Sequence, residues 1–335
     1  MIRPKISVVI PVYNREDVLA ECLAAACGSE YPDFEVIVVD DASTDRSAEV
    51  ASRFPCRLIG METNSGSAAA RNEGARQAAG EILAFIDADI IVKKDTLQKM
   101  ADTLDEEHAA AVVGVYSSRH RNPNAASQYK NLWIRYTYLT SPRHISWVFT
   151  SVTAIRKDVF LQAGGFSRGL RSESGIDDLE FGMRVADAGH KIVMNPEVEV
   201  EHTKEFSFTG FVRNQYTRSK AFTAFALRAG RLRQTAERGR FANVTTDFTL
   251  GIALAYLMVF TGICAIRYSA CLYLFFTLAL LYAFLNVPFL LFFRRHHSVI
   301  KTLKACVILF LDHLVCGFGV LAAGLSLTKR HSDKE

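Results

Sequence analysis

Two carboxylates one residue apart carry the clearest chemistry in this chain. Asp87 and Asp89 follow Ile82–Ile86, an apolar run typical of a strand buried on both faces of a sheet. Open α/β sheets bind ligands at the carboxyl edge of their strands, and side chains at i and i+2 point the same way. The two acids can therefore share one divalent cation, Mg²⁺ or Mn²⁺, of the kind that bridges a diphosphate. Alternatively, they only cap a helix that begins near Lys93.

Alternating strands and helices must position these acids. Apolar runs predict strands at Ile6–Pro11, Val36–Val39 and Arg57–Met61, and the intervening patterns predict helices at Arg15–Cys27, Arg46–Phe54 and Ser67–Ala79. This alternation predicts a parallel sheet with helices on both faces. The second strand also ends in acids, Asp40 and Asp41, so both acid pairs are expected at the same sheet edge.

Several short motifs in this region share an order and spacing with a known family. They are Pro11-Val12-Tyr13-Asn14, Asp40-Asp41-Ala42-Ser43-Thr44-Asp45, Asn64-x-Gly66, Ala70-Arg71-Asn72-x-Gly74 and Asp87-Ala88-Asp89. Together they resemble the family 2 glycosyltransferases of the GT-A fold, over about residues 5–205. The resemblance implies a Rossmann-like α/β domain with a mostly parallel central sheet, a nucleotide-sugar donor and a divalent metal.

The resemblance also implies a set of residues for the nucleotide-sugar pocket. They are Pro11, Tyr13, Asn14, Asp40, Asp41, Asn64, Arg71 and Asp87. A carboxylate that accepts from the uracil N–H, beside a stacked aromatic ring, is a sensible way to read a base. The resemblance favours UDP as the nucleotide, although no residue in this sequence excludes guanosine. The structural alternatives are a loop anchor for Tyr13 and an ordinary helix-surface charge for Arg71.

Acids that would face the acceptor come later in the chain. In the family, a Gly-Gly-Phe turn such as Gly164-Gly165-Phe166 precedes them, and here they are Asp177, Asp178 and Glu180. Asp177 stands where the family more often has Glu. Asp178 is the candidate general base, because inversion needs a carboxylate opposite the leaving diphosphate to take the acceptor proton. If the acceptor is a phosphate, Asp178 would only orient it. Alternatively, these acids cap the following helix and pair with Arg184.

One histidine is a candidate nitrogen ligand. His202 follows the last predicted strand of the domain, where it could join Asp87 and Asp89 at the metal. A lone histidine is more often a structural residue, and that alternative stays open.

Two stretches mix aromatic and basic residues in a way that suits a membrane interface. Residues 125–147 lie at a membrane, pack an aromatic face on the sheet, or do both. Residues 206–241 predict a basic amphipathic helix on an anionic leaflet. Trp133, Gln215 and Arg218 are candidates for the acceptor or membrane side. Gln215-x-x-Arg218 loosely resembles the Gln-x-x-Arg-Trp motif of processive members, but Ser219 replaces Trp, which counts against a polymerase.

The last third of the chain predicts membrane spans at about 248–266, 270–293 and 305–327. The basic island of Arg294, Arg295, Lys301 and Lys304 predicts a cytoplasmic loop. Three spans would then place the tail outside, although Lys329 and Arg330 follow the last span. A re-entrant third segment would resolve that disagreement. Asp312 and His313 inside this segment are functional candidates, or they pair with one another or with another subunit.

Composition narrows the function classes. The net charge of +4, without zinc-finger or stacking patterns, gives no support for nucleic acid. Seven scattered cysteines without CxxC support neither a disulfide framework nor a zinc site, which suits a reducing compartment. The first apolar run is too short for a signal peptide. An oligomer remains possible.

These observations predict an integral protein of the inner or plasma membrane with a cytoplasmic catalytic domain. The predicted parts are a GT-A domain at 1–205, a basic interfacial region at 206–245 and a transmembrane domain at 246–335. The expected activity is metal-dependent, inverting transfer from a UDP-sugar to a lipid-linked or membrane-surface acceptor in cell-envelope glycan or glycolipid synthesis. The alternatives are a polyprenyl-phosphate monosaccharide synthase, a processive synthase, or a non-catalytic membrane scaffold with a decayed transferase domain.

Overall fold

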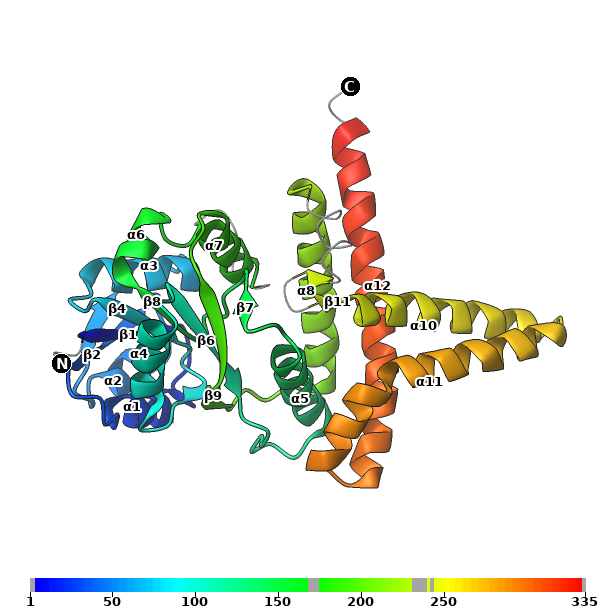
Figure 1. The fold of residues 1–335 in the computed structure, drawn as a ribbon, viewed down its shortest axis with the longest axis horizontal. Helices are drawn as coiled ribbons and strands as arrows, with labels where there is room; N and C mark the ends of the chain where they lie inside the picture. The colour runs from blue at the N-terminus through cyan, green and yellow to red at the C-terminus, as the bar shows by residue number, and fades with distance from the viewer. Residues whose placement is uncertain (1–3, 168–174, 231–239, 242–243, 333–335) are drawn as a thin grey trace. The chain divides into compact units, whose positions relative to one another are not determined.

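The chain forms two compact units in the computed structural model, which describes residues 4–167, 175–230, 240–241 and 244–332 (Figure 1). The first unit contains residues 1–121 and 138–204, and the second contains residues 122–137 and 205–335. The predicted interfacial region 206–245 includes residues 231–239 and 242–243, which lie outside the described residues. Residues 122–137, from the aromatic stretch, group with the second unit.

The first half of the sheet is parallel. Strands β1 (Ile6–Val12), β2 (Phe34–Asp40), β3 (Arg57–Gly60) and β4 (Ile82–Ile86) lie in the order β3-β2-β1-β4. Each neighbouring pair runs in the same direction, with Val8 opposite Val36 on one side and Ala84 on the other. The predicted alternation is thus confirmed here, and it brings the acids after β2 and β4 to one edge.

The second half of the sheet is mixed. Strand β8 (Val152–Arg156) runs antiparallel between β4 and β6 (Ala111–Tyr116), and β9 (Ile192–His202) is parallel to β6. The short strands β5 (Ile90–Ile91) and β7 (His144–Ile145) pair antiparallel with β9. Parallel pairing thus holds for β1 to β4 and for β6 with β9, whereas β5, β7 and β8 pair antiparallel. The local apolar pattern does not encode strand direction, so it could not predict these antiparallel pairs.

Helices cover both sides of this sheet. Figure 1 shows α3 and α7 along one side and α1 and α2 along the other. Helix α2 is shorter than predicted. The helices of the first unit are α1 (Leu19–Cys27), α2 (Ser47–Ala51), α3 (Ser67–Gln77), α4 (Thr96–Glu106), α6 (Lys157–Gln162) and α7 (Ile176–Asp187).

The second unit is helical. It contains most of α5 (Ala125–Leu139), then α8 (Phe208–Arg228), α10 (Thr246–Ala265), α11 (Ala270–His296) and α12 (Val299–Ser332), with a small ribbon of β10 (Arg240–Phe241) and β11 (Val244–Thr245). A buried cluster with Tyr129, Phe211, Phe289 and Leu309 joins α5, α8, α11 and α12. The aromatic rings of α5 in this unit thus pack on helices, and the alternative that they pack on the sheet is wrong for them.

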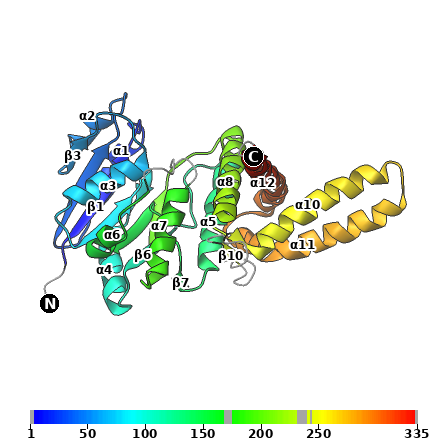
Figure 2. The same ribbon diagram turned by 90° about the horizontal axis from the view of Figure 1, so that it is seen from above.

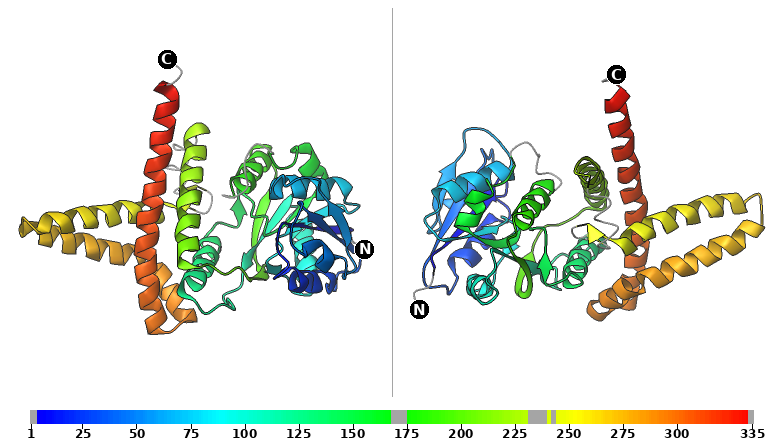
Figure 3. Two further views of the ribbon diagram at one scale, coloured as in Figure 1. Left: turned by 180° about the vertical axis from the view of Figure 1, so that it is seen from behind. Right: turned by 45° about the horizontal axis from the view of Figure 1, so that its top comes forward.

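Three helices in the described part of the chain are long and apolar enough to cross a membrane, as predicted: α10, α11 and α12. Figures 2 and 3 show α10 and α11 as a hairpin. Helix α12 continues unbroken from Val299 to Ser332, so a re-entrant third segment is wrong. Its glycines stay inside the helix, where Gly317 and Gly319 face Tyr256 and Ser219 closely.

Helix α3 lies unusually close to the sheet because of one glycine. A Cβ on Gly74 would overlap the Val9 side chain and press on Val39. We expect Gly74→Ala to lower the free energy of unfolding by about 1–3 kcal/mol, the range for overpacking, despite the better helix propensity of alanine. Chemical denaturation of the purified protein measures the change.

Gly60→Ala is the matched control, because nothing lies within 4 Å of a Cβ at Gly60. It should leave stability nearly unchanged. Equal stability of the Gly74 variant and the wild type would contradict the close packing of α3.

Candidate active site

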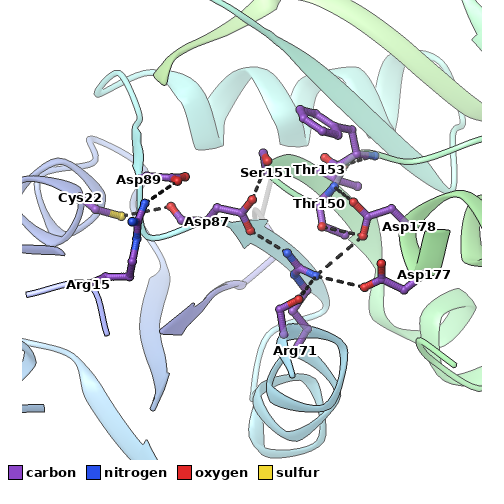
Figure 4. A network of polar contacts seen from close by, with 12 residues as sticks. Arg15, Cys22, Arg71, Asp87, Asp89, Thr150, Ser151, Thr153, Asp177 and Asp178 are labelled. Atoms are coloured by element: carbon purple, nitrogen blue, oxygen red, sulfur yellow. Dashed lines mark hydrogen bonds and ion pairs between the residues drawn. The ribbon is translucent and has the colours of Figure 1, made fainter. Parts of the chain in front are cut away.

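The Asp-x-Asp acids lie in the short connection between β4 and β5 (Figure 4). They do not cap a helix, since α4 begins at Thr96 and its N-cap position is Asp95. The capping alternative is therefore wrong. Both side chains are partly exposed at the sheet edge, which leaves them accessible to a ligand.

Asp87 is held by two donors. Its Oδ1 accepts from Arg71 Nη2 at 2.7 Å, and its Oδ2 accepts from Ser151 Oγ at 2.6 Å. Burial alone would raise the pKa of Asp87, but the Arg71 charge and the Ser151 hydrogen bond outweigh it and hold the pKa below its ordinary value. Asp87 is thus a carboxylate at neutral pH.

Asp89 is paired with an arginine that the sequence analysis did not single out. Arg15 Nη2 lies 2.7 Å from Asp89 Oδ2, and the Asp89 carbonyl accepts from the backbone N–H and hydroxyl of Thr203 at 2.9 and 3.0 Å. These bonds fix Asp89 to the end of β9. Arg15 directly follows the Pro-Val-Tyr-Asn motif, which was the available signal for it.

His202 ends β9 beside Asp89. Its Nε2 lies 3.9 Å from Asp89 Oδ1, and its ring stacks on Tyr116 with centroids 4.4 Å apart. Burial lowers the pKa of His202 to about 4 in spite of the nearby Asp89 carboxylate. A neutral imidazole of this kind can serve as a metal ligand, so the geometry is compatible with that prediction.

The described residues contain no group of three His, Cys, Asp or Glu side chains gathered closely enough to enclose a metal. Asp87 and Asp89 offer two carboxylates as hard oxygen donors, and the His202 Nε2, 3.9 Å from Asp89 Oδ1, offers a nitrogen. Mg²⁺ is usually bound in this way, through one or two carboxylates with substrate phosphates and water completing its shell. The residues therefore fit a cation that arrives together with a diphosphate.

A second pair of acids lies in the first turn of α7. Asp178 accepts from the Thr150 hydroxyl at 2.8 Å, and Asp177 is 1% exposed. Burial and the neighbouring Asp177 charge raise the pKa of Asp178 to about 7, against the opposing effect of Arg71. Burial also raises the pKa of Asp177. Asp178 thus has the pKa that suits a general base.

Arg71 joins the two acid pairs. Its guanidinium is buried, with Nη2 on Asp87 at 2.7 Å and Nη1 at 3.6 Å from Asp177 and 3.8 Å from Asp178 (Figure 4). The alternative of an exposed helix-surface charge is therefore wrong. The Arg71 guanidinium therefore lies between the acid at the end of β4 and the two acids at the start of α7.

The position of helix α7 depends on the close approach of Gly182 to the backbone at Trp147 and Val148, and not on Asp177 or Asp178. A Cβ on Gly182 would overlap the backbone at Trp147 and Val148, so this side of α7 fits only glycine and lies near Thr150. The N-cap position is Gly175, and Arg184 pairs with Glu180 at 2.6 Å. The alternative for Asp177, Asp178 and Glu180 is therefore right in part: Glu180 pairs with Arg184, but none of the three occupies the N-cap position of α7.

The residues predicted for the nucleotide lie on the loops after β1 and β2. Tyr13 is 45% exposed, and Asn14 adopts a left-handed φ of 51° while its Oδ1 accepts from the Thr44 N–H. Asp41 uses both oxygens on the N–H groups of residues 65 and 66, at 2.7 Å each. Asp40 is held through Oδ1 by the N–H of residue 43. Asp40 is thus the better placed of the two acids to meet a base.

The remaining predicted residues are distributed over both units. Pro11 is buried in β1, and Asn64 is exposed before α3. Trp133, Gln215 and Arg218 belong to the second unit, where Trp133 packs edge-on against Phe289 and Arg218 lies over Phe222. Gln215 is buried and bonded to Lys130 and Asp312. Their roles toward an acceptor stay predictions.

Known proteins resemble this chain in sequence and in fold. The model of glycosyl transferase family 2 matches residues 7–162. Glycosyltransferase AglE of Haloferax volcanii is 30% identical over 202 residues, which are 58% of this chain and 66% of AglE. Glycosyltransferase GlyG of Streptococcus pneumoniae is 36% identical over 116 residues, 33% of this chain and 38% of GlyG. The chain thus spans less than two thirds of either relative.

One solved structure shares the fold along nearly the whole chain. Mannosyltransferase PcManGT from Pyrobaculum calidifontis, in complex with GDP-Man and Mn²⁺, aligns with a TM-score of 0.62 at 22% identity, over 93% of this chain and 88% of that one. The GT-A-like fold of the first unit and the match to the family model agree. Residues 7–162 thus form a domain similar to glycosyl transferase family 2.

Proposed function

We propose that this protein is a membrane-bound, inverting glycosyltransferase that moves a sugar from a UDP-sugar to a lipid-linked or membrane-surface acceptor. The observation that carries the proposal is the position of Arg71 between Asp87 and Asp178. A donor-binding carboxylate and a base of suitable pKa then share one buried cation. The three apolar helices and the basic residues of α8 support an acceptor in the membrane.

On the donor side, Asp40 and Tyr13 would read the base, and Asp87, Asp89 and His202 would hold Mg²⁺ or Mn²⁺. When bound, the cation would offset the charge of the diphosphate leaving group. Arg71 and Arg15 would supply further positive charge beside the phosphates, since both already lie on the two acids.

On the acceptor side, Asp178 would take the proton of an acceptor hydroxyl as the new glycosidic bond forms. Thr150 orients the Asp178 carboxylate through its hydroxyl. Asp177 would keep the pKa of its neighbour high, because two adjacent carboxylates resist simultaneous ionisation.

Turnover of defined donors tests this function. The purified full chain is mixed with UDP-sugars and a membrane lipid extract or a polyprenyl phosphate, and nucleotide release and the anomeric configuration of the product are measured. Release with inversion supports the proposal. A retained configuration would contradict the role of Asp178, and no release from any nucleotide-sugar would favour a non-catalytic scaffold.

The rate of sugar transfer should depend on pH, because Asp178 must be ionised to accept the acceptor proton. Because its pKa is about 7, the ionised base is lost as the pH falls, and kcat/KM should decrease about tenfold per pH unit below 7. Asp178→Asn should abolish this dependence and lower kcat by about 100-fold or more, while nucleotide affinity is kept. Steady-state rates from pH 5 to 9 measure both.

Glu180→Gln is a control, since Glu180 pairs with Arg184 and its pKa is lowered rather than raised. It should keep the pH profile. A flat profile in the wild type, with Asp178→Asn still active, would instead point to a phosphate acceptor that needs no base.

Arg15 should compete with a free cation for Asp89. Arg15→Met removes the ion pair of 2.7 Å, so Mn²⁺ affinity without nucleotide should rise about three- to tenfold, as expected for an ion pair worth about 1 kcal/mol. Electron paramagnetic resonance of free Mn²⁺ measures this binding directly. Arg46→Met, which removes an exposed pair with Glu16 nearby, should have no effect, and unchanged affinity in both variants would contradict the competition.

A further inference from the structure

Helix α12 is as apolar as a membrane span, but its neighbour is a charged helix. Phe211 of α8 packs in the cluster that contains Leu309, Gln215 donates to Asp312 at 2.5 Å, and a Cβ on Gly319 would overlap Ser219. The residue numbers in these contacts increase in the same direction along both helices. Helices α8 and α12 therefore run parallel and side by side (Figures 1 and 3). Residues 211–219 thus accompany residues 309–319.

The charges of α8 therefore lie beside the middle of the apolar stretch of α12. Arg213 is exposed, and Arg218 and Lys220 are partly exposed. If α12 crossed the bilayer, α8 would carry these cations into the hydrocarbon, where charged side chains are costly. In the headgroup region the same side chains would reach lipid phosphates.

The inner face of α12 combines buried apolar side chains, such as Ile308 and Leu309, with the buried Asp312. Asp312 is completely buried and accepts from Tyr129 of α5 at 2.8 Å as well as from Gln215, whose carbonyl oxygen accepts from Lys130. The outer face is apolar and exposed, through residues at helical spacing: Leu303, Val307, Phe318, Leu321 and Leu325. The exposed cations of α8 and the apolar outer face of α12 together form an amphipathic surface, which is typical of helices in the membrane interface.

The hairpin of α10 and α11 differs from α12. In their most apolar stretches 17% of residues are buried, against 44% in α12. Helix α10 meets α12 through its first half, where Gly251 faces His313 and the Tyr256 hydroxyl donates to the Leu314 carbonyl at 2.8 Å. The rest of the hairpin extends away, across the direction of α12, in every view (Figures 1 to 3). Helices that lie across one another cannot all follow the membrane normal.

The distribution of charge fits a helix at the surface. With α12 in the interface, the basic island Arg294, Arg295, Lys301 and Lys304 and the later Lys329 and Arg330 lie on the same side. The disagreement that three spans create with the positive-inside rule then disappears.

We propose that α12 does not cross the membrane. It lies with α8 in the interface of one leaflet, against anionic headgroups, with its apolar face toward the acyl chains. Only the α10–α11 hairpin crosses, twice, so the chain segments before α10 and after α11 lie on the same side of the membrane. This inference revises the third predicted span and does not depend on the sugar, the nucleotide or the acceptor.

Protease protection of tagged full-length chains tests the proposal. A cleavable epitope is placed before Met1, between Ile266 and Ala270, or after Glu335, and is digested in sealed spheroplasts and in inverted vesicles. The tags at Met1 and Glu335 should be cut from the same side, and the hairpin tag from the other. The hairpin variant counts only if it remains full-length and monodisperse in detergent.

Two results would overturn the proposal. If the tag at Glu335 is cut together with the hairpin tag and opposite to that at Met1, α12 spans the bilayer. If all three tags are cut from one side, the hairpin does not cross.

Discussion

The buried guanidinium of Arg71 is the interaction on which the site depends. A cation that is 5% exposed is stable only among anions, and here Asp87, Asp177 and Asp178 supply them from two separate elements. Without it, three carboxylates would face one another across the site. The next residue, Asn72, bonds both backbone groups of Phe166, at 2.8 and 2.9 Å. Helix α3, held close to β1 by Gly74, therefore fixes both sides of the site.

Much of the first unit could be predicted from the sequence, because its local patterns and its fold agree. The apolar runs of β1, β2 and β4 and the acids that follow them predicted a parallel sheet with both acid pairs at one edge. The family motifs predicted Arg71 beside the donor acids. Their spacing could not predict that Arg71 also reaches Asp178, since that contact depends on how α7 packs at Gly182.

The features that the sequence did not predict are long-range ones. Arg15 reaches Asp89 across 74 positions, and Thr150 meets Asp178 only because β8 runs antiparallel beside β4. Hydropathy predicted α12 as a span, but hydropathy does not reveal the neighbour of a helix. The partners of Asp312 on α5 and α8 come from residues 183 and 97 positions away. Those partners bury the Asp312 carboxylate inside the unit, and they place the charged helix α8 beside α12.

Thermal unfolding of the full chain in detergent tests whether Asp87 and Asp89 bind a divalent metal together with a nucleotide diphosphate. It is recorded with UDP, GDP and CMP, each with and without Mn²⁺, for the wild type and for Asp89→Ala. A ligand that binds only the folded state raises Tm by mass action. We expect a Mn²⁺-dependent rise in Tm with UDP that Asp89→Ala abolishes. A rise with GDP alone would correct the donor class, and no rise with any nucleotide would contradict the metal–diphosphate site itself.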